Sequence, residues 1–152
     1  YTPFIAGTFP LGIHTKNSDV DVLMYAIDLN ELEASLKSHY ENHEEFECLR
    51  SFVDGVETLI VNFNQGHVPF EVFAQNRQVV EQKAYKHFQV EERLLKLGGD
   101  LFKETVMGIR MDGTKTEPAI AEALDIEADP YNELLILQKA DTHKLINILE
   151  SV

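Results

Sequence analysis

Two aspartates separated by a single residue, Asp19 and Asp21, lie in an otherwise apolar stretch of the chain. Residues i and i+2 of a β-strand project to the same face, so we expect the two carboxylates side by side, with Val20 and Val22 on the opposite face. Neighbouring carboxylates repel each other unless a cation lies between them. The pair therefore predicts a site for a divalent metal ion.

A glycine and a threonine, Gly7 and Thr8, precede these aspartates by a connector of ten residues. The apolar run at residues 4–6 is typical of a short buried strand. Glycine adopts backbone conformations that other residues resist and lets a ligand approach the backbone closely. Thr8 adds a hydroxyl donor. The connector, residues 9–18, contains proline, glycine and asparagine, which predicts a loop or a short irregular helix.

A third carboxylate, Glu71, lies in the otherwise apolar segment 68–73, which reads VPFEVF. Taken alone, it is best interpreted as an ordinary outward-facing strand residue. Together with the aspartates, it can be a third carboxylate that reaches the same site from a neighbouring strand.

The elements that must position these residues follow from local patterns. Strands are expected at residues 4–6, 20–27, 46–53, 58–63 and 68–73, of which 20–27 is the best candidate for a central strand. Asp28, followed by Glu31, forms a capping-box pattern that predicts a helix over 29–40. Residues 64–67 have the composition of a hairpin turn. Pro69 predicts an edge strand or an irregular strand entry.

The pattern becomes helical after Gln75. Helices are expected at residues 78–97, 101–110, 116–124 and 131–139, followed by a last helix that Asp141 or Thr142 caps. Thr116 is the expected cap of the third of these. Strands first and helices afterwards predict an α+β fold: a mixed β-sheet flanked by helices, then a helical C-terminal part. We expect one domain over 1–152, with the sheet-containing core in 1–77 and the helical part in 78–152.

These motifs resemble those of the DNA polymerase beta-type nucleotidyltransferase superfamily. Its signature is an apolar residue, a Gly-Gly or Gly-Ser pair, a gap of about ten residues, an Asp-x-Asp or Asp-x-Glu motif, and a later carboxylate on another strand. The corresponding stretches here are 6–8, 19–22 and 70–72, and Thr8 departs from the usual Gly or Ser. Across nearly the whole chain, segments such as AGTFPLGI, SDVDVL, QKAYKHF and KTEPAIAEAL resemble a small bacterial family of nucleotidyltransferase-like domains of unknown function.

The resemblance implies transfer of a nucleoside monophosphate from a nucleoside triphosphate to a hydroxyl of an unknown small molecule or protein. Asp19, Asp21 and Glu71 are then the catalytic carboxylates and hold two divalent ions. Mg²⁺ is the expected ion, because hard oxygen ligands suit it, and Mn²⁺ is the alternative. Glu71 would also help to remove the proton of the acceptor.

Phosphate contacts are implied at Gly7 and Thr8, whose amides and hydroxyl would cradle the β- and γ-phosphates, and at Ser18. Lys115 precedes an expected helix N-terminus, where a lysine can hold a phosphate, although a solvated turn lysine explains it equally well. Three residues of the long helix could face a cleft or belong to its outer surface: Tyr85, His87 and Arg93.

The amino-acid composition limits the classes of molecule that the protein is expected to bind. The chain has 152 residues, with 26 acidic and 13 basic side chains and a formal charge of −13. A surface with this charge repels phosphate backbones, so nucleic acid is disfavoured as a partner. The same charge favours a cationic acceptor. A homo-oligomer is compatible with the sequence. The single cysteine, Cys48, excludes an intrachain disulfide and favours a reducing cytoplasm, and we expect no membrane span and no signal peptide.

Other functions stay open at this point. A domain that binds nucleotides without transferring them would keep the same residues. A protein-interaction module would use the carboxylates only as surface charge. Metal-assisted hydrolysis of phosphate esters would use them much as a transferase does.

Overall fold

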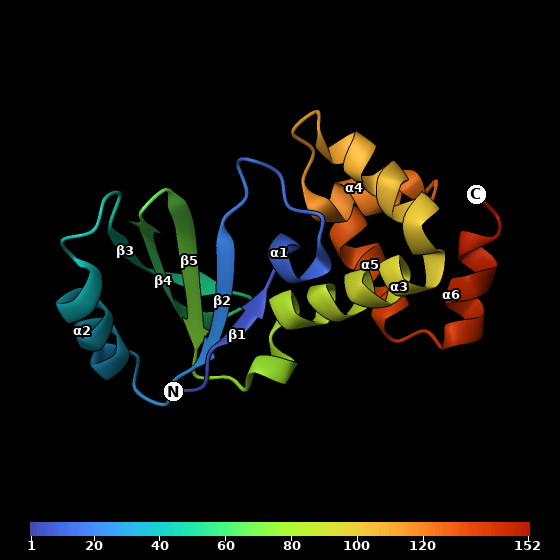
Figure 1. Ribbon diagram of the computed structural model, residues 1–152. Coiled ribbons are helices and arrows are strands. Elements are labelled where there is room, and N and C mark those ends of the chain that lie inside the picture. The colour runs from blue at the N-terminus through green and yellow to red at the C-terminus, as the bar shows by residue number, and fades with distance from the viewer. The chain divides into compact units, whose positions relative to one another are not determined.

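Five strands form one mixed sheet in the order β1-β2-β5-β4-β3 (Figure 1). Its strands are β1 (Phe4–Ala6), β2 (Val20–Tyr25), β3 (Glu47–Val53), β4 (Val56–Gln65) and β5 (Val68–Gln75). The β2–β5 pair is parallel, and the other three pairs are antiparallel. The computed structural model describes all residues, 1–152, and it confirms the predicted α+β fold with a mixed sheet.

One face of this sheet is covered by α2 (Leu29–Tyr40), which has the predicted bounds. Its N-cap is Asp28, whose carboxylate accepts hydrogen bonds from the amides of Asn30 at 2.8 Å and Glu31 at 3.2 Å. Alternate residues of the strands pack against its apolar side, and this hydrophobic core contains Val22, Met24, Leu29, Leu32, Leu59, Val61, Phe63 and Val72. Since strand side chains alternate, the residues between them point to the opposite face.

Of the two alternatives expected for Pro69, the edge strand is excluded, because β5 is the middle strand of the five, and Pro69 instead lies at the entry to β5. Pro69 pairs with Asn64 of β4, whereas the ladder with β2 begins one residue later, at Phe70. The proline therefore lies just outside the second ladder, where its missing amide hydrogen removes no hydrogen bond. The predicted hairpin turn between β4 and β5 is confirmed, with Gly66 at a φ of 64°.

The chain divides into two compact units, one formed by residues 1–10 and 17–82, the other by 11–16 and 83–152. The sheet and α2 belong to the first unit. Short helical turns at α1 (Thr8–Leu11) and η1 (Val79–Glu81) complete its elements, and α1 reaches one residue into the second unit.

Four helices make up the rest of the second unit: α3 (Lys83–Arg110), α4 (Thr116–Ala123), α5 (Pro130–Gln138) and α6 (Thr142–Leu149). Gly99, with a φ of 66°, interrupts α3 at the predicted break between two helices. No helix of the protein is both long enough and apolar enough to span a membrane.

Two helix starts differ from the prediction. The helix expected from residue 78 begins at Lys83, because residues 79–81 form a 3₁₀ turn and the Gln82 side chain donates hydrogen bonds to two carbonyls, including that of Met24 at 2.9 Å. Lys115, and not Thr116, occupies the N-cap of α4. The Thr116 hydroxyl instead receives a hydrogen bond from the Arg110 guanidinium.

Arg110 also fixes the connector at residues 11–16 within the helical unit. Its Nε donates to the carbonyl oxygen of Ile13 at 3.1 Å, and Ile13 is fully buried. Burial lowers the pKa of Arg110, while the nearby carboxylates of Glu91 and Glu117 act in the opposite direction. Consequently, the residues between the Gly-Thr pair and the aspartates are anchored by a helix that lies far along the chain.

The assignment of one sheet face to the core predicts unequal effects for two leucines. Leu59, on the core face, is 0% exposed, whereas Leu49, on the neighbouring strand β3, is 53% exposed. We expect Leu59→Ala to lower the free energy of unfolding by about 2–5 kcal/mol through lost burial and a residual cavity. Leu49→Ala is the matched control and should change it by about 0.5 kcal/mol or less.

Urea unfolding monitored by circular dichroism measures both values. Equal losses for the two variants would contradict the assignment of the core to the α2 face.

Candidate functional site

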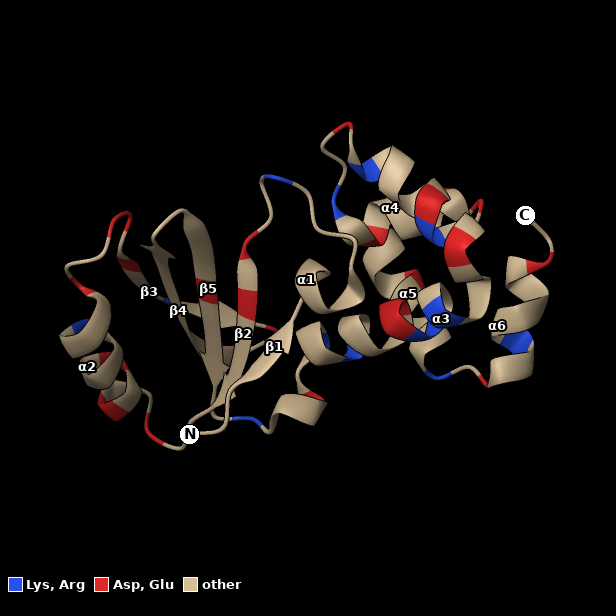
Figure 2. Ribbon diagram, viewed as in Figure 1, with Lys and Arg blue, Asp and Glu red and all other residues tan.

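A row of polar side chains crosses the sheet on the face opposite to α2. Asp21 of β2 is in register with Glu71 of β5, which pairs with Asn62 of β4, which pairs with Glu47 of β3. Residues directly opposite one another on adjacent strands point to the same face, and adjacent strands lie about 4.8 Å apart. We call these four residues the polar row. Acidic residues on both β2 and β5 are visible in Figure 2.

Gly7 lies directly against the carboxylate of Asp21. A Cβ atom added to Gly7 would fall 1.7 Å from Asp21 Oδ2 and 2.7 Å from its Cγ, and Gly7 has a φ of 67°. Both the space and the backbone angle therefore require glycine here. The structure thus brings together two parts of the sequence motif that are separated by thirteen residues.

Thr8 follows as the first residue of α1 and is buried, with 8% of its surface exposed. Its Oγ1 has no hydrogen-bond partner within the protein. Buried hydroxyl groups are normally paired. An unpaired hydroxyl beside Gly7 fits a contact with a bound ligand at this turn.

The three predicted carboxylates are not all gathered at one point. Asp21 and Glu71 are neighbours in register, whereas Asp19 lies just before β2, at the wall of a pocket. No three or more His, Cys, Asp or Glu side chains come close enough together to form a metal-binding group. The Asp21–Glu71 pair nevertheless fits a divalent ion in chemistry and placement, because it presents carboxylate oxygens from two adjacent strands on one face.

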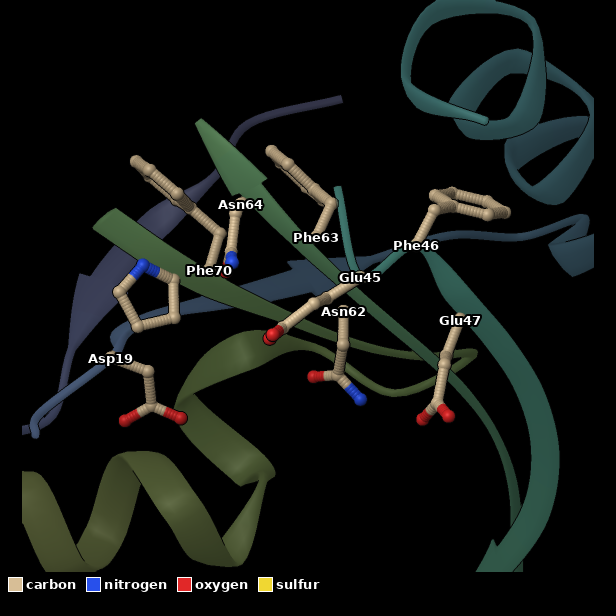
Figure 3. A pocket seen from close by; sticks show the side chains of 9 residues that line it. Asp19, Glu45, Phe46, Glu47, Asn62, Phe63, Asn64 and Phe70 are labelled. Atoms are coloured by element: carbon tan, nitrogen blue, oxygen red, sulfur yellow. The ribbon is translucent and has the colours of Figure 1, made fainter. Parts of the chain in front are cut away.

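The pocket has a volume of about 530 Å³ and belongs entirely to the sheet unit (Figure 3). Its polar lining consists of Asp19, Glu45, Glu47, Asn62 and Asn64. Pro69 and the rings of three phenylalanines complete it, and none of its residues is basic. In Figure 3, the side chains of Asn62 and Glu47 point to one side of the sheet, and the rings of Phe63 and Phe70 point to the other.

Sequence reasoning missed Glu45, Glu47, Asn62 and Asn64 as site residues. Alternation within the strands places Glu47 and Asn62 on polar faces, but only the long-range register shows that they continue the row of Asp21 and Glu71. Glu45 lies between α2 and β3, and its φ of 55° is uncommon for a residue other than glycine.

The remaining candidates have varied surroundings. Ser18 is half-buried and precedes Asp19, and Lys115 is an exposed residue of the helical unit. His87 Nε2 hydrogen-bonds to the Tyr131 carbonyl oxygen at 3.0 Å. Arg93 donates to the carbonyls at the end of α5, Gln138 and Ala140, at 3.1 and 2.8 Å. His87 and Arg93 therefore have structural contacts within the helical unit, where Tyr85 is half-buried on α3.

Fold and site together define an α+β protein whose mixed sheet presents carboxylates from adjacent parallel strands beside a Gly-Thr turn. The chain belongs to the family described as Domain of unknown function (DUF4269), whose family model matches residues 1–137. No curated protein matches the chain.

Three solved structures are similar to the chain. One is Cid1, described by its RNA terminal uridylyl transferase activity, with 18% identity and a TM-score of 0.45 over 72% of this chain and 32% of that one. The second is the GLD-2/RNP-8 complex, with 14% identity and a TM-score of 0.37 over 90% and 67%. The third is the polymerase core of TRAMP, an RNA surveillance complex, with 16% identity and a TM-score of 0.39 over 90% and 49%. The chain thus spans about a third of the length of Cid1.

The contact between Gly7 and Asp21 generates a prediction about their energetic coupling. Gly7→Ala should destabilise the fold by more than about 1 kcal/mol, because its Cβ collides with the Asp21 carboxylate and its φ is unfavourable for alanine. In an Asp21→Ala background the cost should be smaller, since the colliding carboxylate is gone. Thermal and urea unfolding of the four proteins in this double-mutant cycle give the coupling energy.

Gly108→Ala is the matched control. Gly108 lies within α3 with no atom within 4 Å of its added Cβ, so alanine should be neutral or should stabilise the helix by up to about 1 kcal/mol. Additive effects of the changes at Gly7 and Asp21 would contradict the contact.

Proposed function

We propose that this protein is a metal-dependent nucleotidyltransferase, which transfers a nucleoside monophosphate from a nucleoside triphosphate to a hydroxyl of a small molecule or protein. The observation that carries the proposal is the register of β2 and β5, which places Asp21 beside Glu71 on the face opposite to the core. The position of Gly7 against Asp21 supports it further. These contacts join all three parts of the sequence motif within one unit.

Asp21 and Glu71, with Asp19 from the start of β2, would hold the divalent ions, Mg²⁺ or alternatively Mn²⁺. When bound, such ions neutralise the charge of the triphosphate and align the acceptor with it.

The turn at Gly7 and Thr8 would bind the phosphates that leave as pyrophosphate. The missing side chain of Gly7 lets a phosphate approach the backbone amides, and the Thr8 hydroxyl, which has no partner in the protein, can donate to a phosphate oxygen. Ser18 and Lys115 are further candidates for phosphate contacts, in the two different units.

Glu71 would act on the acceptor. Its carboxylate accepts the proton of the acceptor hydroxyl while that oxygen forms a bond to the α-phosphorus and the bond from this phosphorus to the pyrophosphate oxygen breaks. The products are the nucleotidylated acceptor and pyrophosphate. A general base in this position contributes about 10²–10⁴-fold to a rate.

Nucleotide binding can be tested before the acceptor is known. ATP, GTP, CTP and UTP are each titrated with and without Mg²⁺ while the thermal midpoint is measured. At about 100 times its Kd, a nucleotide that binds only the native state should raise the midpoint by about 5–10 °C. We expect this rise to depend on Mg²⁺ and to be lost in Asp21→Asn.

Asp100→Asn is the matched control for the charge change, because Asp100 is exposed on α3 and outside the site. It should keep the full shift. If no nucleotide shifts the midpoint of the folded wild type, the transferase proposal falls, and the interaction module described above takes its place.

Catalysis requires a separate measurement. With an acceptor supplied, Glu71→Gln should lower the rate of pyrophosphate release by about 10²–10⁴-fold. Glu104→Gln, an exposed change on α3, should leave the rate unaltered. Pyrophosphate or phosphate released equally fast without any acceptor would indicate a hydrolase, and nucleotide binding without release would indicate an inactive nucleotide-binding domain.

A further inference from the structure

We propose that the pocket beside the polar row binds the acceptor, and that this acceptor is a small hydroxylated molecule carrying two or more ammonium groups. The inference rests on the proposed function and adds the chemical class of the second substrate.

The lining selects for positive charge. Three carboxylates contribute to it, those of Asp19, Glu45 and Glu47, and no lysine, arginine or histidine does. These carboxylates repel a phosphate group that carries no metal ion, whereas an ammonium group gains charge-assisted hydrogen bonds from them. The amides of Asn62 and Asn64 offer both donors and acceptors, which suit the hydroxyl groups of a polar ligand.

The pocket also lies where an acceptor is needed. Asn62 and Glu47 belong to the polar row, in which Glu71 and Asp21 are the next members. A molecule held against Asn62 is therefore one strand away from Glu71, the residue that would receive its proton. Asp19 lines the same pocket and completes the connection with the carboxylate motif.

Glu45, one of the three carboxylates that line the pocket, has a positive φ angle. Glu45 has a φ of 55°, a region that residues with a side chain rarely adopt. The preceding residue is fixed to the sheet, because the amide of Asn64 donates to the Glu44 carbonyl at 2.8 Å. In Figure 3, the Glu45 carboxylate extends between Asn62 and Asp19. The hydrogen bond at Glu44 thus positions the loop that carries Glu45 at the edge of the pocket.

The volume fits the same class of ligand. At about 530 Å³, the pocket lies within the range of about 300–1,000 Å³ that is usual for small-molecule sites. It accommodates a small molecule with several polar groups.

The test uses 1,3-diamino-2-propanol, which has two ammonium groups and one hydroxyl, and glycerol as its neutral counterpart. Each is titrated into the full chain at about 0.15 M NaCl, which limits long-range attraction by the acidic surface. Binding is followed by the ¹⁵N NMR signals of the side-chain amides. We expect the diamine to shift the signals of Asn62 and Asn64 in a saturable way and glycerol to leave them unchanged.

The double variant Glu45→Gln/Glu47→Gln should bind the diamine about tenfold more weakly or worse, since charge-assisted hydrogen bonds become neutral ones. Both residues are exposed, so the fold should be retained. Asp100→Asn/Glu104→Gln removes the same charge from α3 and should bind within twofold of the wild type. Equal weakening in both double variants, or no saturable shift in the wild type, would overturn the proposal.

One further variant separates this inference from the function on which it rests. Asp21→Asn should lose the nucleotide-dependent thermal shift and keep diamine binding, because Asp21 is not among the residues that line the pocket. If the wild type binds nucleotide but not the diamine, the proposed class of acceptor is wrong and the proposed transferase function stands. If the wild type binds the diamine but no nucleotide, the pocket is a cation-binding site and the proposed transferase function is wrong.

Discussion

The parallel pairing of β2 with β5 is the constraint on which the rest of the structure depends. These strands are separated in the chain by α2, β3 and β4, yet their register aligns Asp21 with Glu71. Strand side chains alternate between faces, so a slip of one residue would move Glu71 into the core and Val72 to the solvent. The register that buries Val72 therefore also places the Glu71 carboxylate on the opposite face.

The core beneath α2 enforces that register. Val22, Val72 and Val61 lie in one line across β2, β5 and β4, on the face that the helix covers. Each of them is almost fully buried, so a one-residue slip of one strand against another would expose apolar surface. Apolar packing on the core face thus determines where the polar side chains lie on the opposite face.

Local patterns could predict much of this fold. The bounds of α2 follow from a cap and an apolar periodicity that lie within the helix itself, and the glycine at position 99 marks a break that is equally local. Errors arose where distant parts of the chain decide the outcome. The role of Pro69 depends on where β2 begins to pair, and the start of α3 depends on a hydrogen bond from Gln82 to Met24.

Part of the candidate site could likewise be predicted from local sequence patterns. Asp21, Glu71 and the Gly-Thr turn could be identified because residue types and spacing carry the motif. Asn62 and Glu47 could not, because a strand sequence shows which residues share a face but not which residue of another strand lies opposite. The pocket, which forms where several strands end, is likewise a product of pairing.

The anchoring of residues 11–16 by Arg110 has a consequence for the order of events during synthesis. The strands and α2 are complete once residue 82 has left the ribosome, but the partner of Ile13 follows 28 residues later, counting 83 to 110. At about 5–20 residues per second, the nascent chain spends on the order of seconds with Leu11 and Ile13 of this loop lacking the helical unit that buries them. A fragment that ends at residue 82 would keep that loop exposed permanently, and it would be a poor substitute for the whole chain.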